Sequence, residues 1–130
     1  MRVLVCGSRN WADEDFIYRE LVLLQRTEHI DVIIEGGANG ADKIAQKVAG
    51  KLNIPVEEYL ADWQSYGKRA GHTRNYKMLT DGKPDIVLAF HDNILASKGT
   101  KHMVQIAERA GILTSVHHHV LHTGLAAKTQ

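Results

Sequence analysis

The sequence predicts an α/β fold, a single domain with three layers (α/β/α) in which helices cover both faces of a parallel sheet of about five strands. The apolar runs are short, rich in β-branched residues and continuous, as in strands buried on both faces. Helical patterns alternate with them, and this alternation implies parallel strands joined by right-handed crossovers. The predicted strands are residues 3–6, 30–34, 54–59, 86–90 and 112–116.

Four helical patterns separate the predicted strands. In the second, Ala41, Ala45 and Val48 recur at spacings of three and four, which places them on one face toward the core. Gly111 is expected to end the fourth helix. The helices are predicted at about residues 16–24, 41–52, 70–79 and 100–110. Residues 60–67 are predicted to form a long irregular loop, and long loops in compact domains are often functional.

Length and charge limit the functional classes. At 130 residues, the chain is expected to form one domain over residues 1–117, followed by a polar tail of residues 118–130. Sixteen basic and fifteen acidic side chains give a net charge of +1, so no global positive field for nucleic acid is expected. No signal peptide or membrane-length apolar run is recognisable, which predicts a cytoplasmic protein without a membrane partner. The single cysteine, Cys6, is interpreted as a small buried apolar residue.

Four loops are predicted to hold one phosphate-bearing ligand. Three of them directly follow a predicted strand, and three precede a helical pattern. Because the carboxyl ends of parallel strands meet at one crevice, where α/β sheets bind ligands, these loops are expected to converge. The loops are Gly7-Ser8-Arg9, Gly36-Gly37-Ala38-Asn39-Gly40-Ala41-Asp42, residues 68–75 and Ser97-Lys98-Gly99-Thr100.

The first two loops combine glycines with a helix start. Gly7 allows close backbone approach, Ser8 can hydrogen-bond a phosphate or ribose, and Arg9 can add a charged fork, although the motif also suits a plain turn. The second loop precedes a helix whose free amides attract anions. Asp42 either complements the helix dipole or contacts the ligand. Neither a G-x-G-x-x-G fingerprint nor a Walker A sequence is present.

The other two loops add positive charge and hydroxyl groups. Lys68, Arg74 and Asn75 lie in a basic window, and Trp63 before it can stack on a base. An aromatic residue with arginines nearby also fits single-stranded nucleic acid. In the fourth loop, Ser97, Gly99 and Thr100 form an anion cradle at a helix start, while Thr100 alone would serve as an N-cap.

A histidine tract near the C-terminus is the remaining motif. Its composition is typical of a metal-binding segment, with histidines at His117, His118, His119 and His122. No carboxylate or cysteine nearby in sequence completes a familiar set of ligands, so neither a metal nor another cofactor is predicted.

Taken together, these loops resemble the SLOG superfamily of Rossmann-like domains, and in particular its small YspA/YpsA-related group. The resemblance spans roughly residues 1–116. It rests on Gly7-Ser8-Arg9 with Trp11, Glu35-Gly36-Gly37-Ala38 with Gly40-Ala41-Asp42, Ala61-Asp62-Trp63, Gly67-Lys68 with Ala70-Gly71, Arg74-Asn75 with Met78, and Ser97 with Gly99-Thr100.

The superfamily includes phosphoribohydrolases of the LOG type, which split a nucleoside monophosphate into base and ribose 5-phosphate. The resemblance implies Arg74 at the phosphate or ribose and the Gly99-Thr100 amides on the phosphate. This chain lacks the glutamate that follows the threonine in those enzymes and stabilises the sugar cation. Glu35, Asp42 or Asp62 are the acidic candidates to replace it.

These observations predict a domain that binds a nucleotide or nucleotide-derived ligand as a sensor or sequestering protein. Two alternatives stay open: hydrolysis of an N-glycosidic bond at the same site, and binding of single-stranded nucleic acid, which the near-neutral charge makes less favourable. Self-association is expected from the resemblance, and twofold dimers are the commonest form.

Overall fold

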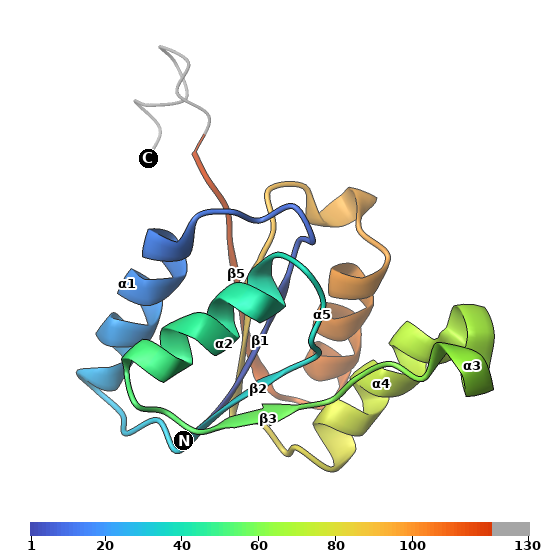
Figure 1. Ribbon diagram of the computed structural model, residues 1–130, viewed down its shortest axis with the longest axis horizontal. Coiled ribbons are helices and arrows are strands. Elements are labelled where there is room, and N and C mark those ends of the chain that lie inside the picture. Colours follow the sequence, from blue (N-terminus) through green and yellow to red (C-terminus); the bar gives the residue numbers. More distant parts are fainter. Residues whose placement is uncertain (121–130) are drawn as a thin grey trace.

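A parallel sheet of five strands forms the centre of the protein, in a computed structural model that describes residues 1–120. The strand order is β3-β2-β1-β4-β5 (Figure 1). All four pairs of neighbouring strands are parallel, which confirms the predicted α/β class. The strands are β1 (Arg2–Gly7), β2 (Val32–Glu35), β3 (Val56–Glu58), β4 (Ile86–Phe90) and β5 (Leu113–His117).

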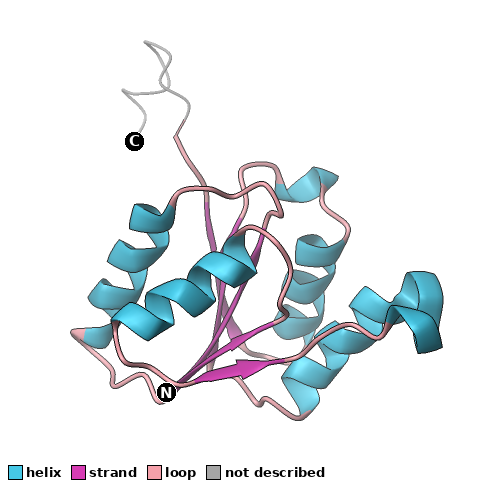
Figure 2. Cartoon of the chain, viewed as in Figure 1, coloured by secondary structure: helices cyan, strands magenta, loops and turns pink. Residues whose placement is uncertain are grey.

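Helices cover both faces of the sheet, as Figure 2 shows. On one face, α1 (Glu14–Gln25) and α2 (Ala41–Lys51) bury Ile17, Leu21 and Val48 against alternate residues of β1. On the other face, α4 (Ala70–Thr80) and α5 (Gly99–Arg109) bury a second cluster that contains Met78, Met103 and Ile106. The four predicted helices are therefore confirmed, and each predicted end lies within two residues of the observed end.

The edge strands differ from the prediction that all strands are buried on both faces. Residues of β3 and β5 are half-buried or exposed, and Leu113 of β5 is 66% exposed. The predicted strand at 54–59 shrinks to three residues because Pro55 has no N–H to donate to a ladder, although its carbonyl accepts from Ile33 N. Burial on both faces holds for the inner strands β1, β2 and β4.

The segment predicted as an irregular loop at 60–67 contains a short helix, α3 (Trp63–Tyr66), which continues through a 3₁₀ turn (Gly67–Arg69) into α4. Asp62 caps α3, because its Oδ1 accepts a hydrogen bond from the Ser65 amide at 3.1 Å. In Figure 1 the segment projects beyond the body of α4. The residues of α3 are exposed, so local hydrogen bonds, and not packing against a hydrophobic core, hold this helix.

The strand order reverses between β1 and β4, because the chain first builds β2 and β3 on one side of β1 and then crosses to the other. Gly7 and Phe90 end these two strands side by side. In open α/β sheets the crevice at such a reversal is the usual ligand site. Within the described residues, no helix has the length and apolar character that a membrane span requires.

Candidate functional site

A cavity of about 420 Å³ opens at the carboxyl edge of the sheet, where β1 and β4 end beside the N-terminus of α5. We call it the central cavity. All four predicted segments contribute to it at this edge of the sheet, although residues 70–75 of the third segment belong to α4 and are helical rather than a loop. The predicted residues that line it are Gly7, Ser8, Arg9, Ala38, Asp42, Arg74, Asn75, Ser97, Gly99 and Thr100.

A second cavity of about 350 Å³ adjoins the central one on the side of β2 and α3. The two cavities share Arg9, Ala38 and Arg74. Predicted residues found in the second cavity alone are Gly36, Gly37 and Trp63, whose indole is 53% exposed.

Three predicted ligand-binding residues lie outside both cavities. Gly40 and Ala41 instead join the first two loops: the Ala41 amide donates to the Ser8 carbonyl at 3.1 Å, and a Cβ on Gly40 would collide with the backbone of Ser8 and Arg9. Lys68 is exposed in the 3₁₀ turn and lines neither cavity.

Arg74 fastens the second loop to α4. Its Nη1 donates to the Gly36 carbonyl at 2.6 Å, and its Nε donates to Asn75 Oδ1 at 3.2 Å. Asn75 is itself buried, and its Nδ2 donates to the Gly99 carbonyl at 3.2 Å. The pair therefore connects the loops after β2 and before α5 and holds a guanidinium at the boundary of the two cavities.

Asp42 faces the central cavity from the first turn of α2. Its Oδ2 accepts hydrogen bonds from the amides of Gly36 and Ala38, each at 3.2 Å, so the carboxylate shapes the glycine loop. Burial raises the pKa of Asp42 to about 6, against the opposing effect of these amides and of Arg74. Of the three acidic candidates, Asp42 alone lines the central cavity.

The other two acidic candidates, Asp62 and Glu35, accept hydrogen bonds from backbone amides of the protein itself. Asp62 is the α3 cap. Glu35 is fully buried beneath the glycine loop, where its Oε1 accepts from the Gly37 amide at 2.6 Å and its Oε2 has no hydrogen-bond partner among the described residues. Burial and the adjacent Glu58 carboxylate raise the pKa of Glu35 above its ordinary value, which favours the protonated carboxyl at this position.

The pH dependence of stability tests this protonated Glu35. A carboxyl whose pKa is higher in the folded than in the unfolded state stabilises the fold at low pH and loses that contribution as the pH rises above 4.5. Glu35→Gln supplies a permanent N–H at this position. We expect the free energy of unfolding of the variant, measured in urea from about pH 5 to about pH 9, to fall less steeply with pH than that of the wild type. Parallel curves would contradict this assignment.

The lining charge of the central cavity is positive. Arg9, Arg74 and Lys98 are its cations, against the single carboxylate of Asp42. The first turn of α5 adds free amides and the positive end of the helix dipole, and the Thr100 amide there is already held by Ser97 Oγ at 3.0 Å. An anionic group fits this arrangement.

Sequence reasoning missed Asn10 and His91 as polar lining residues, and it included Lys98 only as a member of the fourth loop. The available signal was their position: Asn10 lies in the loop after β1, His91 directly follows β4, and Lys98 caps the start of α5. The histidine tract makes separate contacts: the His117 ring stacks on Phe90, and that of His119 stacks on Trp11. Within residues 1–120 no three potential ligands converge on a metal site, and His122 lies outside the described residues.

Two comparisons show which known proteins the chain is similar to. The model of the YspA, cpYpsA-related SLOG family matches residues 1–66. The chain is also 39% identical over 117 residues to the Gene 61 protein of Mycobacterium phage D29, covering 85% of this chain and 91% of that protein. The matched family segment includes the loops after β1 and β2 and the whole of α3. The chain therefore belongs to the YspA, cpYpsA-related SLOG family.

Proposed function

We propose that the protein binds a nucleotide or nucleotide-derived ligand, with a phosphate in the central cavity. The observation that supports this most strongly is the position and charge of that cavity: it lies where the strand order reverses and carries three cations and one helix N-terminus against one carboxylate. Arg74, the Gly99 amide and the Thr100 hydroxyl would hold the phosphate, because charge-assisted donors such as the guanidinium bind phosphate best.

The base would occupy the second cavity against Trp63. Arg74 and Ala38 belong to both cavities, so a ligand can extend from one into the other without leaving the protein surface. Between the two, the second loop offers backbone groups to a ribose or a second phosphate. The exposed indole supplies a flat apolar face, and stacking on such a face tolerates any base.

Hydrolysis of an N-glycosidic bond is a second candidate function, and Asp42 is the observation that favours it. A buried carboxyl with a pKa of about 6 can exist in either protonation state near neutral pH, as a general acid or base requires. In this reading Asp42 supplies the carboxylate that the missing glutamate provides in LOG-type enzymes.

One experiment tests both functions. Purified protein is incubated with AMP, GMP, ADP, ADP-ribose and NAD, and the mixtures are analysed by native mass spectrometry. An intact bound nucleotide supports the binding function, whereas release of free base, abolished in Asp42→Asn, supports hydrolysis. If no nucleotide is retained or cleaved, the proposed function is wrong.

Trp63→Ala tests the position of the base. We expect the affinity for ADP, measured by calorimetry, to fall by about tenfold, because one stacked base contributes about 1–3 kcal/mol. Tyr66→Ala is the matched control: Tyr66 is 52% exposed on the same short helix but lines neither cavity. Equal losses in the two variants would count against the second cavity as the base site.

A further inference from the structure

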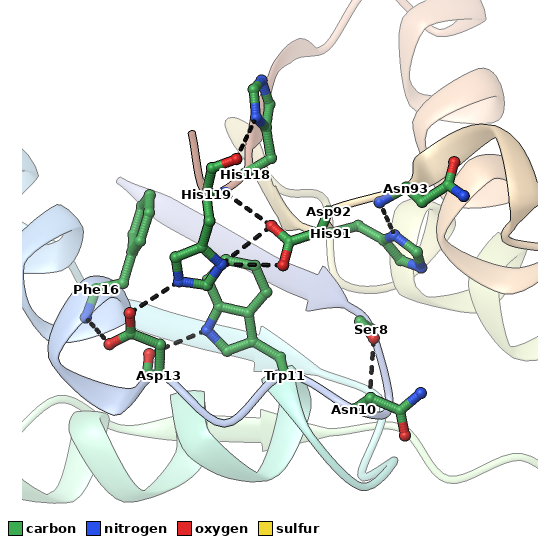
Figure 3. A network of polar contacts seen from close by, with 10 residues as sticks. All are labelled: Ser8, Asn10, Trp11, Asp13, Phe16, His91, Asp92, Asn93, His118 and His119. Atoms are coloured by element: carbon green, nitrogen blue, oxygen red, sulfur yellow. Dashed lines mark hydrogen bonds and ion pairs between the residues drawn. The ribbon is translucent and has the colours of Figure 1, made fainter. Parts of the chain in front are cut away.

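A third cavity, of about 420 Å³, adjoins the central cavity on the side opposite Trp63. The central and third cavities share Ser8, Asn10 and His91, so the ends of β1 and β4 form the boundary between them. Figure 3 shows the residues around it, which come from the loop after β1, the cap of α1, the loop after β4 and the segment after β5.

His119 builds the far wall of the third cavity. Its ring stacks on Trp11 with 4.6 Å between centroids, its Nε2 lies 2.8 Å from Asp13 Oδ2, and its Nδ1 lies 3.0 Å from each oxygen of Asp92 (Figure 3). The Asp92 carboxylate also accepts from the His119 amide. Both ring nitrogens are therefore occupied, and three segments distant in sequence are held together.

The wall formed by Asp13, Asp92 and His119 carries a net negative charge, whereas the lining of the central cavity is positive. Hydrogen bonds with Asp13 and Asp92 raise the pKa of His119, and the same contacts lower the pKa of both carboxyls. Because a carboxylate oxygen lies within hydrogen-bonding distance of each ring nitrogen, both nitrogens act as donors and one imidazolium faces two carboxylates. A second anionic group would be repelled here, whereas hydroxyl and amide N–H groups can donate to the carboxylate oxygens.

His91 stands at the boundary as an uncharged donor. The Asn93 amide donates to His91 Nδ1 at 2.9 Å, which places the ring proton on Nε2. Burial lowers the pKa of His91, so the ring is neutral near pH 7. A group that passes from the central into the third cavity meets this N–H donor and the side chains of Ser8 and Asn10.

We propose that the third cavity is a second compartment of the ligand site, which takes an uncharged group rich in hydroxyls or amides joined to the bound phosphate. The ligand class is then a pyrophosphate or phosphodiester substituted on both sides: a base and ribose toward Trp63, and a sugar-like group toward His119. This inference rests on the proposed function, because it requires a phosphate in the central cavity.

ADP and ADP-ribose test the inference, since they differ by a ribosyl group on the terminal phosphate. We expect wild-type protein to bind ADP-ribose at least about tenfold more tightly than ADP in calorimetry at fixed salt. Asn93→Trp fills the third cavity, which Asn93 lines without lining the other two. It is expected to remove that preference and leave the affinity for ADP within about twofold.

Leu95→Trp is the control, because Leu95 lies two residues further along the same turn, is 80% exposed and lines none of the three cavities. It should retain the preference for ADP-ribose. Equal affinities of the wild type for the two compounds, or a preference that survives Asn93→Trp, would overturn the inference and leave the proposed function standing. If the wild type binds neither compound, the inference is overturned, and the proposed function is overturned too if AMP, GMP and NAD also fail to bind.

Discussion

Replacing Gly40 by alanine is expected to lower the free energy of unfolding by about 3 kcal/mol or more. Gly40 has φ 80° and ψ −127°, a backbone conformation that side-chain-bearing residues avoid. An added Cβ would also collide with the Ser8 carbonyl and lie 2.6 Å from the carbonyl atoms of Arg9. These neighbours are backbone atoms, so the two loops would have to separate. Urea-induced unfolding followed by circular dichroism measures the loss.

Gly50→Ala is the matched control for this prediction. Gly50 is exposed in α2, and a Cβ there meets no atom within 4 Å. We expect this substitution to raise the free energy of unfolding by about 0.5–1 kcal/mol, because alanine restricts the unfolded chain and favours a helix. If Gly40→Ala unfolds at the same urea concentration as the wild type, the tight contact between the first two loops is wrong.

The architecture was predictable because burial leaves a periodic trace in the sequence. Strands β1, β2 and β4 are covered on both faces, so apart from Arg2 and Glu35 at strand ends they form continuous apolar runs, and the helices between them carry one apolar face. The same reasoning fails at the edges of the sheet. Residues of β3 and β5 lack a neighbour on one side, and apolar residues there do not indicate burial: Leu113 is 66% exposed.

The candidate site was predictable as a set of loops but less so residue by residue. Parallel strands deliver their following loops to one edge, and that rule brings Ser8 and Ser97 to one cavity, which Arg74 reaches from inside α4. A glycine or an acid in such a loop can still serve another part of the chain. Gly40 accommodates the Ser8 backbone and Asp62 caps a helix, and only the three-dimensional contacts distinguish these roles from ligand binding.

The third cavity was beyond sequence reasoning because its wall depends on distant contacts. His119 reaches Asp92, 27 residues away, and Asp13, 106 residues away. In the sequence His119 is one of three consecutive histidines, a pattern that predicts a solvated or metal-binding segment. The local pattern contains no information about its two carboxylate partners.

Arg74→Ala is expected to weaken the binding of ADP by about 100-fold. The guanidinium lies at the boundary of the central and second cavities, where it can donate to a phosphate while Nη1 remains on the Gly36 carbonyl. A charge-assisted hydrogen bond contributes about 1.5–3 kcal/mol, and the alanine variant also leaves the Gly36 carbonyl without this donor. Calorimetric titration at fixed salt measures the affinity.

Two further variants separate the loss of ligand contact from the loss of local structure. Arg74→Lys keeps the charge but not the planar fork, so its affinity should lie between those of the wild type and Arg74→Ala. Arg69→Ala removes an exposed cation from the 3₁₀ turn that lines none of the cavities and should bind as the wild type does. Equal losses of ADP affinity in Arg69→Ala and Arg74→Ala would mean that the phosphate interacts only with the overall positive charge of this segment. An Arg74→Ala variant that folds and binds ADP normally would place the phosphate elsewhere.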